Sequence, residues 1–109
     1  PDLIAKKNDS IVIIECKPKF DLGDKNKLLN IINEDKRKEK LYMELNQRKL
    51  INKNLQELNY NNFLINIRYC MSFSGNYELL DKISILNILD KNDNCKLIQS
   101  KNHMYHLLI

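Results

Sequence analysis

Two apolar runs near the start of the chain flank a short polar segment. Residues 2–6 and 10–16 are rich in apolar and β-branched side chains, and residues 7–10 (KNDS) between them have the Asn-Asp chemistry of a tight turn. The pattern predicts a β-hairpin. Residues 11–14 (IVII) are apolar on both faces, which is typical of a strand at the centre of a sheet covered by helices.

A helix is expected after Pro18, which ends that strand. Gly23 offers a turn and Asp24 an N-cap, and the inner side of the helix carries Leu28, Leu29, Ile31 and Ile32. Residues 33–40 (NEDKRKEK) contain no apolar side chain, so the helix either breaks there or runs fully solvated.

A second amphipathic helix is predicted from Leu41 to the Asn-rich residues 59–62 (NYNN). Its apolar positions are Leu41, Met43, Leu45, Leu50, Ile51, Leu55 and Leu58.

The last part of the chain reads mainly as strands. Residues 63–71 alternate apolar and polar side chains, which predicts a strand that ends near Gly75. Residues 83–89 and 95–100 flank a turn-forming segment as a second hairpin, and residues 104–109 add a final strand. A helix over residues 78–89 is the alternative for this region.

Composition sets broad limits on the class of protein. A chain of 109 residues forms one domain or part of one, and its net charge of +4 with a pI near 9.0 permits a polyanionic partner. With only two glycines, a dinucleotide or Walker-type phosphate loop is nearly excluded.

Cysteine usage and hydropathy indicate the compartment. Cys16, Cys70 and Cys95 are odd in number and widely spaced, so a reducing, cytoplasmic environment is expected rather than a disulfide framework. The apolar runs are far shorter than the roughly 18–20 residues of a membrane helix, and no signal-peptide pattern is present, so a membrane partner is not expected.

The first hairpin brings two acids together if its turn is centred on residues 8–9. Counting outwards from the turn pairs Lys7 with Ser10, Ala5 with Val12, Leu3 with Ile14 and Asp2 with Glu15. Two carboxylates about 5 Å apart repel each other by roughly 3 kcal/mol at an effective dielectric constant of about 20. A divalent cation removes this repulsion, and Mg²⁺ commonly uses one or two protein carboxylates with water and phosphate oxygens.

Neighbouring residues extend this constellation. Strand alternation places the ammonium of Lys17 on the face of the two acids, where it can orient a metal-bound water and offset charge in a transition state. The side chain of Cys16 is expected on the opposite, core-facing side, with its backbone carbonyl available to a metal ion.

Pro1-Asp2, a hairpin and then Glu15-Cys16-Lys17 resemble the PD-(D/E)xK signature of the restriction-endonuclease-like nucleases. The resemblance implies a mixed α/β fold with an αβββαβ core and hydrolysis of DNA phosphodiester bonds. It also implies Mg²⁺, replaceable by Mn²⁺, held by Asp2, Glu15 and the Cys16 carbonyl, and a water-orienting role for Lys17. A restriction-type endonuclease is the first expectation, and a structure-selective nuclease follows.

The resemblance covers residues 1–71 as a nuclease-like core, and residues 72–109 form a C-terminal extension of the same domain. Family members place a helix and a strand before the PD position, where this chain begins. We therefore expect these elements to be absent from the chain or supplied by a partner chain. A homodimer is expected if both DNA strands are cut.

Other basic residues are weaker candidates for nucleic-acid contact. Lys19, Lys36, Arg37, Lys38 and Arg68 can reach phosphates, although residues 34–40 fit a solvated helix face better. A zinc site at Cys95, His103 and His106 lacks a fourth ligand at a recognised spacing. The alternative to a nuclease is a non-catalytic nucleic-acid-binding or assembly subunit, in which Glu15 and Lys17 are solubilising charges.

Overall fold

The computed structural model describes all residues except 8, 49–58, 93 and 108–109. Within these limits the chain forms five strands, three α-helices and one 3-10 turn. They are β1 (Leu3–Lys7), β2 (Ser10–Cys16), α1 (Leu22–Asn33), α2 (Asp35–Gln47), α3 (Tyr60–Asn66), β3 (Ile67–Ser74), β4 (Ser84–Ile88), β5 (Cys95–Ile98) and η1 (His103–Tyr105). The mixed class of helices and strands predicted from the sequence is confirmed.

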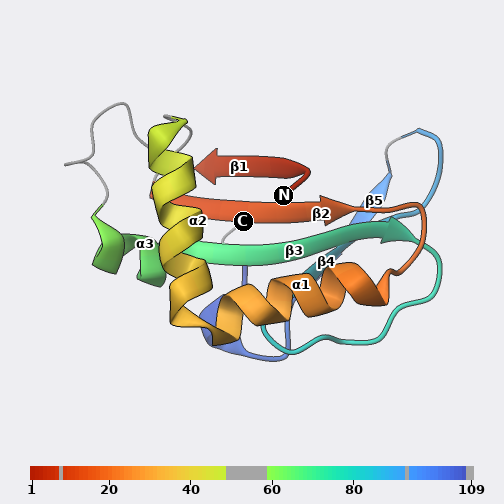
Figure 1. Ribbon diagram of the computed structural model, residues 1–109. Coiled ribbons are helices and arrows are strands. Elements are labelled where there is room, and N and C mark those ends of the chain that lie inside the picture. The colour runs from red at the N-terminus through yellow and green to blue at the C-terminus, as the bar shows by residue number, and fades with distance from the viewer. Residues whose placement is uncertain (8, 49–58, 93, 108–109) are drawn as a thin grey trace.

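The strands form one mixed sheet in the order β1-β2-β3-β4-β5 (Figure 1). The two outer pairs, β1 with β2 and β4 with β5, are antiparallel, whereas β3 runs parallel to both β2 and β4. The parallel strands therefore end at the same edge of the sheet. Strand β3 continues past residue 71, and β4 and β5 extend the sheet that β1 and β2 begin.

Helices α1 and α2 cover one face of this sheet (Figure 1). The side chains of Ile11 and Ile13 point to this face and are fully buried, whereas Val12 and Ile14 on the other face are half-buried. Strand β2 is flanked by a strand on each side, which fits its apolar sequence. The core lies between the sheet and the helices.

Helix α1 begins earlier than the sequence predicts. Asp21, and not Asp24, is the N-cap, because its Oδ1 accepts a hydrogen bond of 2.8 Å from the backbone N–H of Asp24. The helix ends at Asn33, since Glu34 is extended, and α2 starts at Asp35. The polar segment thus contains a break, followed by the mostly exposed first turns of α2.

The predicted strand over residues 63–71 is wrong in its first half. Asn59 caps α3 by accepting a 2.9 Å bond from the N–H of Asn62, and Phe63 is fully buried on that helix. Its ring contacts Tyr42 of α2 at 5.1 Å between centroids. The strand starts at Ile67 and ends at Ser74, next to Gly75 with its positive φ of 97°.

The second hairpin is confirmed, and the final strand is not. Strands β4 and β5 pair with Ile88 opposite Cys95, and the side chain of Asp90 closes the turn by accepting from the N–H of Asn92 at 2.8 Å. Residues 103–105 form a 3-10 turn instead of a strand. The predicted positions Leu50, Ile51, Leu55, Leu58, Leu108 and Ile109 lie outside the described residues.

Candidate functional site

The first hairpin has the register that the sequence predicts. Leu3 pairs with Ile14 and Lys7 with Ser10, so Asp2 follows the end of β1 on the side of Glu15. The Asp2 carboxyl lies close enough to Glu15 for the two side chains to influence each other. The two acids of the signature therefore lie together at the carboxyl end of β2.

Glu15 is the most unusual residue of this site because it is a buried acid. It shares the helix-covered face with Ile11 and Ile13, and only 4% of it is exposed. An ionised carboxylate in such a place needs a cation. Lys27 of α1 supplies it, with Nζ 2.9 Å from Oε1, and the N-terminal amine of Pro1 lies 3.7 Å from the same oxygen.

Cys16 does not point to the core. The helices cover the face of Glu15, and alternation along β2 therefore turns the Cys16 side chain to the less covered face, where it is half-buried. The prediction that Cys16 faces the core is wrong. Burial raises the pKa of the Cys16 thiol, and the nearby negative charge of Asp2 raises it further.

Asp2 is anchored to the strand that carries Glu15. Its Oδ2 accepts a hydrogen bond of 2.8 Å from the backbone N–H of Cys16. This hydrogen bond is the main reason why the pKa of the Asp2 carboxyl is lowered. Burial opposes it, and the positive charges of Lys17 and Lys27 lower the pKa further. Asp2 is therefore ionised at neutral pH.

Lys17 follows directly after the end of β2. Its backbone N–H donates to the carbonyl of Ser72 at 3.0 Å, which continues the β2–β3 pairing, and its side chain is exposed. The positive charge of Lys17 contributes to the lowered pKa of Asp2 and opposes the burial that raises the pKa of Asp24. The structure thus brings Asp2, Glu15 and Lys17 into one electrostatic neighbourhood.

Asp24 and Lys27 join this neighbourhood although sequence reasoning did not include them. Burial raises the pKa of the Asp24 carboxyl, and its buried Oδ2 has no hydrogen-bond partner among the described residues. The sequence signal was weak: a helix that starts directly after a strand places its first two turns over the end of that strand. Acidic and basic residues in those turns are therefore candidates for the same site.

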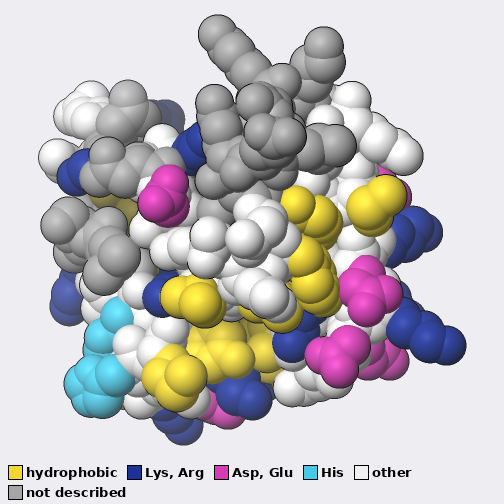
Figure 2. Space-filling model, turned by 90° about the vertical axis from the view of Figure 1, so that its left-hand side faces the viewer, with side chains coloured by type: hydrophobic (Ala, Val, Ile, Leu, Met, Phe, Trp, Pro, Cys, Tyr) yellow, Lys and Arg dark blue, Asp and Glu magenta, His cyan; other side chains and the backbone are white. Residues whose placement is uncertain are grey.

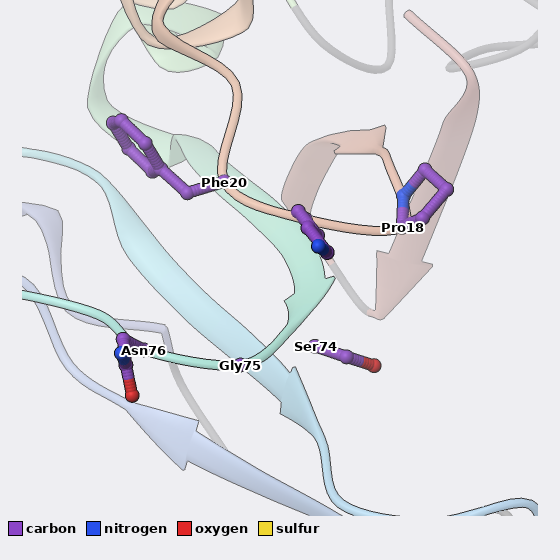
Figure 3. A pocket seen from close by; sticks show the side chains of 6 residues that line it. Pro18, Phe20, Ser74, Gly75 and Asn76 are labelled. Atoms are coloured by element: carbon purple, nitrogen blue, oxygen red, sulfur yellow. The ribbon is translucent and has the colours of Figure 1, made fainter.

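A groove lies beside this site, between the segments that follow β2 and β3 (Figure 3). One hollow of about 460 Å³ is lined by Pro18, Lys19, Phe20, Ser74, Gly75 and Asn76. A second hollow of about 470 Å³ shares Phe20 and Asn76 and adds Tyr77 and Lys25 among others. Lys19 thus borders a concave surface, as a phosphate contact would require.

The other basic candidates lie elsewhere. Lys36, Arg37 and Lys38 are in the first turn of α2, beyond the far end of α1 from the hairpin acids (Figure 1). Arg37 pairs with Glu34, and Nζ of Lys38 lies 3.6 Å from Asp35. On the face shown in Figure 2, basic and acidic side chains are interspersed, which does not make a basic patch.

The guanidinium of Arg68 is already hydrogen-bonded to backbone carbonyls. Its Nη1 donates to the carbonyls of Ile65 and Ile67 at 2.8 Å each, and its Nε donates to that of His106 at 3.1 Å. Burial lowers its pKa. Arg68 therefore ties the C-terminal segment to the start of β3, and phosphate contact would cost these bonds.

In the described part of the chain, no group of three or more His, Cys, Asp and Glu residues is arranged to hold a metal ion. His103 and His106 do lie close together, with ring centroids 4.6 Å apart, but Nε2 of His106 bonds to the carbonyl of Ser100.

Comparison of the chain with protein-family models, curated proteins and solved structures finds no match. None of the described helices is long and apolar enough to cross a membrane.

Proposed function

We propose that the protein is a Mg²⁺-dependent endonuclease of the PD-(D/E)xK type that hydrolyses DNA phosphodiester bonds, as a restriction-type or structure-selective enzyme. The observation that supports this most is the juxtaposition of Asp2 and Glu15 at the carboxyl end of β2, with Lys17 two residues beyond Glu15. A buried glutamate beside a second carboxylate is costly for folding alone. A cation-dependent activity would explain why the two carboxylates lie together.

The donor set fits magnesium. Mg²⁺ prefers carboxylate and carbonyl oxygens and keeps several waters, so Asp2, Glu15 and the Cys16 carbonyl would hold it with the substrate phosphate completing the shell. When bound, the ion would lower the pKa of a coordinated water and neutralise part of the phosphate charge.

The side chains of the chain have distinct tasks in this proposal. The lowered pKa of Asp2 keeps its carboxylate ionised and ready for a cation. Lys27 pairs with Glu15 in its buried position and, being 53% exposed, can turn towards solvent when another cation arrives. Lys17 orients the attacking water and offsets negative charge in the transition state.

One observation favours a second candidate, a non-catalytic nucleic-acid-binding or assembly subunit. Asp2 already accepts a hydrogen bond from Cys16, and Glu15 is already paired with Lys27 and the N-terminal amine. A structural role for both acids would account for these contacts without a metal. Such a protein would bind polyanions with salt dependence but without metal dependence.

The deciding experiment measures metal binding and DNA cleavage on the same samples. Calorimetry with Mg²⁺ and Mn²⁺, and a cleavage assay on single-stranded and duplex DNA, would compare the unchanged chain with Glu15→Gln. We expect the chain to bind and cut, and Glu15→Gln to lose both, because the amide keeps the shape and removes the charge.

Glu44→Gln is the matched control, since Glu44 is exposed on α2. It should keep the metal affinity and the cleavage rate of the unchanged chain. A folded chain that binds neither ion and cuts no DNA contradicts the nuclease proposal. Equal metal binding by both variants would contradict the assignment of Glu15.

A further inference from the structure

The groove beside the hairpin is formed by the segments that leave two parallel strands at their carboxyl ends. Open sheets with parallel strands commonly bind ligands at this edge. Strand β2 ends at Cys16 and β3 at Ser74, and the N–H of Ser74 donates to the carbonyl of Pro18 at 3.1 Å. The two walls of the groove are therefore joined directly (Figure 3).

The groove is held in shape by buried residues beneath it. The ring of Phe20 packs edge-on against the buried Phe73, with centroids 5.7 Å apart and an angle of 75°. The buried Asn87 donates from Nδ2 to the carbonyls of Phe73 and Gly75, at 3.2 and 3.1 Å. A ligand thus meets a surface whose position is already fixed.

The surface of the groove combines exposed aromatic rings with positive charge. Phe20 is 41% exposed and Tyr77 is 38% exposed. Lys19 and Lys25 line the same hollows, against one acidic lining residue, Glu78. Rings on which bases can stack, next to ammonium groups that meet phosphates, are typical of single-stranded nucleic-acid sites.

We propose that this groove binds an unpaired nucleobase and its phosphate, so that the substrate of the neighbouring site is single-stranded or locally unpaired DNA. Phe20 and Tyr77 provide the stacking surfaces, Lys19 contacts the phosphate, and the amide of Asn76 faces the base edge. Lys19 lies two residues beyond Lys17, so the strand bound in the groove leads to the hairpin acids. This inference rests on the proposed function and adds the form of DNA to it.

The test is a binding experiment without metal. In EDTA at low salt, fluorescence anisotropy would compare a labelled oligothymidylate of about 12 nucleotides with a duplex of equal length. We expect the single strand to bind at least about tenfold more tightly. Phe20→Leu and Tyr77→Leu should each weaken single-strand binding by about tenfold or more, because they remove a ring but keep apolar contact.

Met43→Ala is the control, since Met43 is 55% exposed on α2, outside the groove. It should leave both affinities unchanged, and thermal unfolding would confirm that all variants fold. In Lys19→Gln, the salt dependence of binding should correspond to the release of about one counterion fewer than in the unchanged chain.

The outcomes separate this inference from the nuclease proposal. Equal affinity for single strand and duplex, or an unchanged affinity in Phe20→Leu and Tyr77→Leu, overturns the groove assignment even where metal-dependent cleavage is found. Ring-dependent binding of the single strand supports the groove, even where the unchanged chain binds no metal and cuts no DNA.

Discussion

The ion pair between Glu15 and Lys27 is the most informative contact at the scale of single residues. Glu15 is 4% exposed whereas the Lys27 side chain is 53% exposed, so one partner is desolvated and the other is not. Removing Lys27 takes away the ammonium group that lies 2.9 Å from Oε1 of the buried carboxylate. Losing a partner of a buried charge is costly, although exposure of the lysine reduces the effect.

Lys27→Met should lower the free energy of unfolding by about 1–2 kcal/mol near neutral pH. The hydrogen bond to Glu15 raises the pKa of Lys27 above its ordinary 10.5. Its stabilising contribution is therefore complete below pH 10.5 and is lost as the pH rises through the raised pKa. Urea denaturation at neutral and strongly alkaline pH would show the difference between the two proteins shrinking.

Lys40→Met provides the comparison for this prediction, because Lys40 is an exposed lysine of α2. Its stability should change little at either pH. A loss in Lys27→Met no greater than that in Lys40→Met would mean that the ion pair between Lys27 and Glu15 does not stabilise the fold.

At the scale of elements, α3 is a case in which tertiary packing overrides an alternating apolar pattern in the sequence. Phe63, Ile65 and Ile67 alternate as a strand would, yet the first two belong to a helix. Asn59 caps that helix, and the Phe63 ring packs beside Tyr60 and Tyr42 with centroids 6.4 and 5.1 Å away. Burial of a whole aromatic ring outweighs a period of two that spans only a few residues.

Asn59→Ala should cost about 1 kcal/mol, because the cap of α3 is lost and the N–H of Asn62 is left without this partner. Thermal or urea unfolding would measure it. Asn61→Ala tests the specificity of the effect, since Asn61 is exposed within the same helix and should change stability by less than about 0.5 kcal/mol. Equal losses of stability in both variants would show that the Asn59 cap does not specifically stabilise α3.

At the scale of the whole molecule, one core joins the two ends of the chain. The buried cluster includes Ile11 and Ile13 of the first hairpin together with Ile85 and Ile98 of the second. Strand β3 lies between β2 and β4 and pairs parallel with both. Cooperative unfolding of the whole chain would therefore directly test the prediction that the C-terminal part belongs to the same domain.

Ile85→Ala should cost about 2–5 kcal/mol, because Ile85 is 1% exposed and its truncation leaves a cavity. If the chain is one cooperative unit, hydrogen exchange of β2 amides should accelerate together with that of β4. Leu89→Ala, at a residue that is 59% exposed, should leave both rates nearly unchanged. Faster exchange confined to β4 and β5 would show two separately folding parts.

The sequence by itself determined the features that depend on near neighbours. Turn residues and a period of two set the register of the first hairpin, and with it the meeting of Asp2 and Glu15. The same rules predict the second hairpin, where Ile88 pairs with Cys95. These features follow from local chemistry because the residues that fix them lie within a few positions of one another.

Only the tertiary structure decided the features that depend on distant segments. The position of α1 determines that Glu15, and not Cys16, faces the core, and it brings Lys27 to that acid. The side chain of Arg68 donates a hydrogen bond to the His106 carbonyl in the C-terminal segment. Alternation along a strand gives two faces but does not say which one a helix will cover, since that choice depends on the area buried by the complete fold.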